Sequence, residues 1–218
     1  WVSHLSSSVS TEGRWVKGVS DKGQLLGIAI VAPSEFSTSI GNDGKPYVRI
    51  RSASQVANTR FVTVLYPTDE ARWNGRPDIS LLGNDERVSG VRVLQNGTRD
   101  HLITHGVQGE VSIGEYTFDG QVASVNRSAD GSLQRVFLGG GSSLSDNGVV
   151  LVRAPAKIQV VQVDYQGAAL AVYGDNLDGV SLYGPGVDVG QVTVNGTPVA
   201  AVMQDGYVVL PSSSQPSP

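Results

Sequence analysis

The 218-residue sequence contains no cysteine, which excludes a disulfide framework and any metal site built from thiolates. No apolar run approaches the roughly 20 residues of a membrane-spanning helix. No amphipathic pattern of period 3.6 continues for even about ten residues, and the nucleotide-binding and metalloprotease motifs are missing. These absences argue against a helical protein. The lack of disulfides in a β protein of this size favours a bacterial product over a small secreted animal domain.

Excess positive charge is also missing, since the formal net charge is -4 and the pI is about 5.3. Such a balance attracts neither nucleic acid nor an anionic membrane, so we expect neither as a partner. The sequence begins at Trp1 and shows no signal-peptide pattern. We expect a mature or excised piece of a secreted or periplasmic bacterial protein.

Glycine is abundant, with 27 residues, and many short runs rich in Val and Thr lie between glycine, proline and asparagine turns. This pattern predicts about a dozen short strands before Pro155 and about six after it. We therefore predict an all-β fold, namely a layered antiparallel β-sandwich of the supersandwich type followed by a small second β-sheet module. The predicted domains are residues 1–153 and 154–211, with 212–218 as a flexible tail or linker.

Several local signals refine this prediction. Asn195-Gly196 predicts a type I′ hairpin turn, and Asp119-Gly120 is interpreted in the same way. The triple glycine Gly139–Gly141 predicts a hinge or bulge, and Pro67 is expected to end the strand before it. The segment Tyr47–Ser52, which is expected to form a strand, alternates between apolar and basic side chains.

Catalytic and metal-binding signals are weak. Of the three histidines, His101 and His105 fall on one predicted strand about 13 Å apart, which is too far for two ligands of one ion. Clusters of Asp and Asn at residues 42–43, 145–147 and 175–178 offer oxygen ligands of the kind that calcium prefers. Turn chemistry explains these clusters better, so we expect no cofactor.

The loop Arg72-Trp73-Asn74-Gly75-Arg76 is the strongest binding candidate in the sequence. A tryptophan is costly to expose unless it packs or binds, and arginine suits the carboxylate or sulfate groups of acidic sugars. We predict that Arg72, Trp73, Asn74 and Arg76 bind carbohydrate. The alternative interpretation is a tryptophan folded over a sheet edge, with solubilising arginines beside it.

Four segments follow one another in the order found in one enzyme family. They are Trp1–His4 (Trp-x-x-His), Gly23–Pro33 (a glycine-led strand ending in Pro), Phe61–Pro67 and Phe118–Arg127, the last followed by Asp130-Gly131. In this order they resemble the β region of heparinase II/III-like polysaccharide lyases. The resemblance covers roughly residues 1–153, and the remaining residues read as a generic small β module.

The resemblance implies the non-catalytic β region of an acidic-polysaccharide lyase, which packs against an α-helical toroid that carries most of the catalytic residues. Because some members of this family have a histidine of the β region in the cleft, the resemblance makes His4 a contributory catalytic candidate, although a structural imidazole is an equal alternative. Two other functions stay open from the sequence: an autonomous carbohydrate-binding module and a structural or adhesion β-domain.

Overall fold

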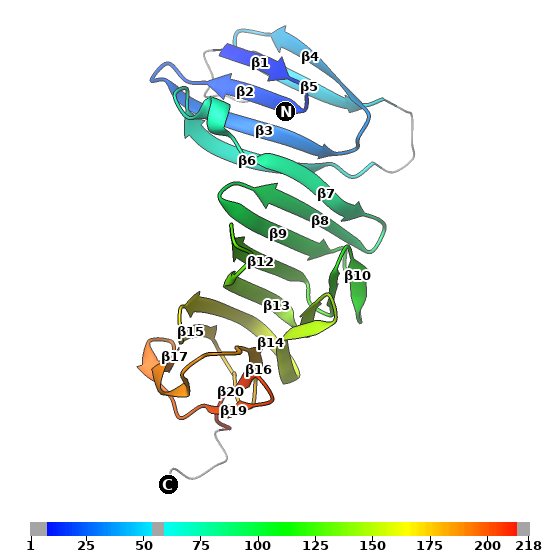
Figure 1. The fold of residues 1–218 in the computed structure, drawn as a ribbon. Coiled ribbons are helices and arrows are strands. Elements are labelled where there is room, and N and C mark those ends of the chain that lie inside the picture. Colours follow the sequence, from blue (N-terminus) through cyan, green and yellow to red (C-terminus); the bar gives the residue numbers. More distant parts are fainter. Residues whose placement is uncertain (1–7, 54–58, 213–218) are drawn as a thin grey trace. The chain divides into compact units, whose positions relative to one another are not determined.

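The chain is an all-β protein whose strands form layered, mainly antiparallel sheets, which confirms the predicted fold class. The structure is a computed structural model that describes residues 8–53 and 59–212 (Figure 1). Within these ranges, helix is limited to the short turns η1 (Trp73–Gly75) and η2 (Val189–Gln191), and no helix has the length and hydropathy needed to cross a membrane. The chain divides into two compact units, residues 1–81 and 82–218.

Unit 1 contains a four-stranded antiparallel sheet in the order β1-β2-β3-β6 and a separate hairpin, β4–β5 (Figure 1). The hairpin covers one face of the sheet, because its Val48 joins Val16 and Ile30 of the sheet in one apolar cluster. The strands are β1 (Ser8–Glu12), β2 (Trp15–Val19), β3 (Gln24–Ala32), β4 (Phe36–Asn42), β5 (Pro46–Ser52) and β6 (Val62–Asp69).

Unit 2 is a β-sandwich. One layer has the order β7-β8-β9-β12-β13-β14-β15-β17-β18, and in the other layer β10 and β11 lie beside β13 while β16, β20 and β19 lie beside β14. β15 and β17 pair in parallel. The strands are β7 (Asp78–Asn84, which crosses the division between the units), β8 (Val88–Leu94), β9 (Gly97–Thr104), β10 (Val111–Ile113), β11 (Tyr116–Phe118), β12 (Val122–Ser128), β13 (Leu133–Asp146), β14 (Val149–Gln166), β15 (Ala169–Gly174), β16 (Ser181–Tyr183), β17 (Val192–Val194), β18 (Thr197–Pro198), β19 (Val202–Gln204) and β20 (Tyr207–Val209).

The long hairpin β13–β14 belongs to both layers of unit 2. One half of each strand pairs with β12 or β15, and the other half pairs with β11 or β16. The register shifts between Gly141 and Ser143, directly after the triple glycine, which confirms the predicted bulge. At this bend a Cβ added to Gly141 would lie 2.6 Å from the Cα of Gly120, so only glycine permits the two backbones to approach so closely.

Apolar side chains from both layers form one core in unit 2, with Phe118 of β11 and Leu102 of β9 fully buried. Asp100, which is 1% exposed, carries a charge into this core. Its carboxylate accepts hydrogen bonds from the guanidinium of Arg92 and, at 2.6 Å, from the hydroxyl of Tyr116. Burial and this hydrogen bond raise the pKa of Tyr116. Because Tyr116 lies on β11, the bond ties the two layers together.

The structure divides the chain at a different place from the boundary that we predicted between residues 153 and 154. Strand β14 runs through Pro155 without interruption, and the compact units separate between Leu81 and Leu82. Pro155 lies between Arg153, which pairs with β16, and Ile158, which pairs with Gly141. The missing N–H of the proline therefore falls at the corner of the strand, where β13 makes no pairing with it.

The predicted turns have mixed outcomes. Asn195 and Gly196 have φ angles of 50° and 81° between β17 and β18, which confirms the type I′ turn. The prediction for Asp119-Gly120 is wrong, because the chain crosses there from β11 in one layer to β12 in the other. Pro67 does not end its strand, since β6 continues to Asp69 at the edge of its sheet, where a missing N–H is tolerated.

We expect Gly141→Ala to destabilise the protein by about 2–3 kcal/mol, because the added methyl group meets backbone atoms that have no room to move. Urea unfolding followed by circular dichroism measures the change. Gly75→Ala is the matched control, since Gly75 has no positive φ and nothing lies within 4 Å of its added Cβ. An unchanged unfolding midpoint for Gly141→Ala would show that the bend relaxes easily.

Asp119 stabilises the same bend. Its carboxylate accepts hydrogen bonds from the backbone N–H groups of Ser142 (2.7 Å) and Ser143 (2.8 Å) and from the Ser142 hydroxyl. Burial alone would raise the pKa of this carboxyl, but these hydrogen bonds and the charge of Lys157 hold it below its usual value. A lowered folded pKa means that the stabilisation is present above the unfolded pKa and is lost as the pH falls through the folded pKa.

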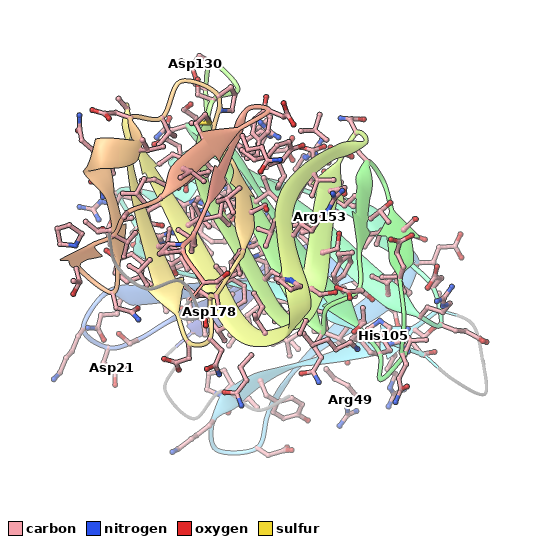
Figure 2. The ribbon with its side chains drawn as sticks, turned by 90° about the horizontal axis from the view of Figure 1, so that it is seen from below. Asp21, Arg49, His105, Asp130, Arg153 and Asp178 are labelled. Atoms are coloured by element: carbon pink, nitrogen blue, oxygen red, sulfur yellow. The ribbon has the colours of Figure 1, made fainter. Side chains whose placement is uncertain are left out.

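We therefore expect Asp119→Ala to cost on the order of 1 kcal/mol of stability near neutral pH, and we expect the gap to wild type to close in acid. Urea unfolding across the acidic range tests this, with Asp21→Ala, an exposed turn residue, as the control (Figure 2). A gap that stays constant down to the lowest pH would contradict the role of the charge.

Candidate functional site

The loop that the sequence singled out is packed onto the sheet of unit 1. Trp73 is 3% exposed, and its ring meets Trp15 edge to face at 5.6 Å. A Cβ on Gly27 would lie 2.6 Å from the Trp73 ring, so the glycine makes room for the indole on β3. The indole N–H donates to the Glu12 carboxylate at 3.2 Å. Trp73 therefore has no free ring face on which a sugar could stack.

The other members of the loop differ in exposure. The Arg76 guanidinium lies 4.6 Å from the centre of the Trp73 ring and pairs with Glu12 at 3.3 Å, so it is occupied by structural contacts. Arg72 and Asn74 are exposed, and Arg72 lies 3.6 Å from a carboxylate oxygen of Asp69. This geometry matches the alternative interpretation of a tryptophan folded over the sheet. Glycan binding by Arg72 and Asn74 stays a prediction.

The two histidines that the structure describes belong to no metal site. His4 lies outside the described residues. His101 is on β9, where burial lowers the pKa of its imidazole, whereas His105 follows the end of that strand and has its Nε2 2.8 Å from the Ser89 hydroxyl. Among residues 8–53 and 59–212, no group of three or more His, Asp or Glu side chains could hold a metal ion. Asp146, which belongs to one of the Asp and Asn clusters, is the ion-pair partner of Arg127.

A different set of basic and aromatic side chains lies together on the outer side of the β4–β5 hairpin. Val48 faces the sheet, so the alternate residues Tyr47, Arg49 and Arg51 face outward; we call these three the Tyr-Arg stripe. Residues two apart on a strand are about 6.6 Å apart, so the three side chains form a row. Arg49 extends outward from the hairpin (Figure 2).

The neighbours of the Tyr-Arg stripe leave its charges uncovered. Across the hairpin, Arg49 and Arg51 lie opposite Ser39 and Ser37, which are small and neutral. Tyr47 lies opposite Gly41, and its ring occupies the space that a side chain at position 41 would fill. The guanidinium of Arg49 is 5.7 Å from the centre of the Tyr47 ring.

Within the described part of the chain, neither Arg49 nor Arg51 has a carboxylate within ion-pair distance. The hairpin from Phe36 to Ser52 contains Lys45 in addition to the two arginines and Asp43 as its one carboxylate, which gives a net charge of three minus one, or +2. Because the whole chain has a net charge of -4, the hairpin is a local positive surface on an acidic protein.

A second surface lies on the outer face of the larger layer of unit 2. Strand pairing places Ile103, Val122, Gly139 and Val160 side by side across β9, β12, β13 and β14. Ile103 is 52% exposed and Val160 is 41% exposed, with Tyr173 also exposed nearby on β15. This row is an exposed apolar strip on that sheet face.

A scan against protein-family models and a search of curated proteins found no match to this chain. The arrangement of side chains is therefore the basis for a functional interpretation. The sequence showed the alternation at residues 47–51, but it did not show that the hairpin covers a sheet with one face and exposes Arg49 and Arg51 on the other.

We expect Trp73→Ala to destabilise the protein by about 3–5 kcal/mol, because it removes a buried indole together with its contacts to Trp15 and Arg76. Urea unfolding followed by the fluorescence of the remaining tryptophans measures this. Arg72→Ala, an exposed neighbour, should change the stability by less than about 0.5 kcal/mol. Full stability of Trp73→Ala would contradict the structural role assigned to the indole.

Proposed function

We propose that this chain is the non-catalytic β region of a secreted bacterial lyase that acts on uronic-acid polysaccharides. In this proposal it supports an α-helical catalytic domain and contacts the acidic glycan. The observation that carries the proposal is the Tyr-Arg stripe, in which two arginines lie beside a tyrosine on one strand and have no carboxylate partner among residues 8–53 and 59–212. The order of motifs that resembles heparinase II/III-like lyases supports the same function.

The chemistry of the stripe suits a carboxylated sugar chain. Each guanidinium can bind a carboxylate or sulfate with two parallel hydrogen bonds, and the flat tyrosine ring suits the face of a sugar. Nucleic acid is a poorer fit, because proteins that bind it present a broad basic surface and usually a basic domain, whereas this chain is acidic overall. In a uronic-acid polysaccharide the carboxylates are separated by uncharged sugar rings. The two arginines of the stripe suit the carboxylates, and the tyrosine suits a sugar ring.

The apolar row on unit 2 supports the scaffolding part of the proposal. Exposed Ile103, Val160 and Tyr173 lie on one sheet face, and exposed apolar strips of this kind mark surfaces that another protein part covers. We propose the helical catalytic domain as that partner. The elimination itself needs a base for the proton next to the carboxylate and an acid for the departing oxygen, and the proposal assigns these to the helical domain, with His4 as a contributor.

The test is binding of the chain to hyaluronan, heparan sulfate, alginate and polygalacturonate by affinity electrophoresis, with dextran as the neutral polymer. We expect at least one uronate polymer to bind, and we expect Arg49→Glu/Arg51→Glu to weaken that binding by about tenfold or more, because two attractive charges become repulsive. Rising salt should weaken the wild-type complex, since the contacts are exposed.

Arg14→Glu/Lys22→Glu is the matched control, because it makes the same change in net charge at two exposed turn residues of the same unit. This variant should keep most of the binding. Equal weakening by both variants would show that only net charge matters. A wild-type chain whose migration none of the four polymers retards would overturn the glycan contact.

A further inference from the structure

An open groove of about 650 Å³ lies in unit 2, where several turns of the sandwich meet. The groove is bordered by the turns β12–β13, β13–β14 and β14–β15 and by the segment that follows β16. Asp130, in the first of these turns, lies at this end of the strands, and Asp178 lies at the other end (Figure 2). The residues that line the groove include Arg127, Leu133, Asn147, Leu151, Tyr165 and Tyr183. All of these residues belong to unit 2, so the groove is independent of the Tyr-Arg stripe.

Two tyrosines of the groove are held in place by contacts of their own. The Tyr165 hydroxyl donates to the backbone carbonyl of Tyr183 at 2.7 Å, and burial raises the pKa of Tyr165, so it stays neutral. The Tyr183 ring meets Tyr207 edge to face at 6.0 Å. Rings fixed in this way lose little freedom when a ligand binds, which favours binding.

The polar side of the groove has no net charge. Arg127 pairs with Asp146, whose side chain is 7% exposed, and also donates to the carbonyl of Gly131 at 3.0 Å. Asp146 accepts a further hydrogen bond from the Asn147 side chain at 3.2 Å. The guanidinium has five N–H donors, so donors remain for a ligand, while the ion pair cancels the attraction for an anion.

We infer that this groove binds an uncharged sugar residue. A sugar ring has an apolar C–H face, which suits tyrosine rings and an aliphatic floor, and hydroxyl groups, which suit the amide of Asn147 and the spare donors of Arg127. The volume falls within the range of small-molecule sites and accommodates one or two rings. This inference goes beyond the proposed function and does not rest on it, because it concerns a different unit and a ligand without charge.

The experiment uses the full chain with maltose, cellobiose and lactose as probes, followed by saturation-transfer NMR and titration. Val149 lines the groove and is 40% exposed, so Val149→Trp fills the groove without disturbing the core. Val202→Trp is the matched control, because Val202 is an exposed valine on another strand of the same unit, away from the groove. Circular dichroism and a melting curve establish whether both variants fold.

We expect at least one of the disaccharides to bind the wild type and Val202→Trp equally, and to bind Val149→Trp about tenfold or more weakly. No signal from any of the three probes, or equal binding by Val149→Trp, would overturn the inference. Preference for a proline-rich peptide over every disaccharide would overturn it as well, since aromatic-lined grooves also bind such peptides. Loss of uronate binding in the stripe variants leaves these outcomes unaffected, so the two proposals fail separately.

Discussion

The close approach of Gly141 to Gly120 is the constraint on which unit 2 depends. Because neither residue has a side chain, β13 can bend out of the larger layer while the connection from β11 to β12 passes directly beside it. At the bend, the backbone N–H groups of Ser142 and Ser143 donate hydrogen bonds to the Asp119 carboxylate. One long hairpin can thus serve both layers and bring its tip, at Asn147, to the groove.

Features of the fold that arise from neighbouring residues could be predicted from the sequence. The Asn195-Gly196 turn and the bulge after the triple glycine follow from the preferences of the residues involved. Asp119-Gly120 and Pro155 could not be interpreted in this way. The same dipeptide that makes a hairpin turn also serves as a crossing between layers, and proline is accepted in a strand wherever no ladder bond is needed. Only the long-range pairing of β13 distinguishes these cases.

The candidate site shows the same limit. The sequence identified Trp73 as unusual, but the partners that decide its role, Glu12 and Trp15, lie about 60 residues earlier in the chain. A tryptophan among arginines looks like a binding platform until the carboxylate that fixes it is known. The Tyr-Arg stripe was visible as an alternation, yet its exposure depends on the packing of Val48 against Val16 and Ile30, which belong to other strands.

Two groups of arginines in this chain differ physically, and the difference bears on the proposed function. Arg92 and Arg127 are partly buried and paired with the buried carboxylates of Asp100 and Asp146, so their removal would leave a charge without a partner inside the protein. Arg49 and Arg51 are exposed on the outer side of the hairpin, whereas Val48 on its inner side joins the apolar cluster. Exposed guanidiniums with no structural role are free to bind an external anion. In the proposed function the hairpin therefore separates folding from glycan recognition, because its inner face packs on the sheet and its outer face carries exposed positive charge.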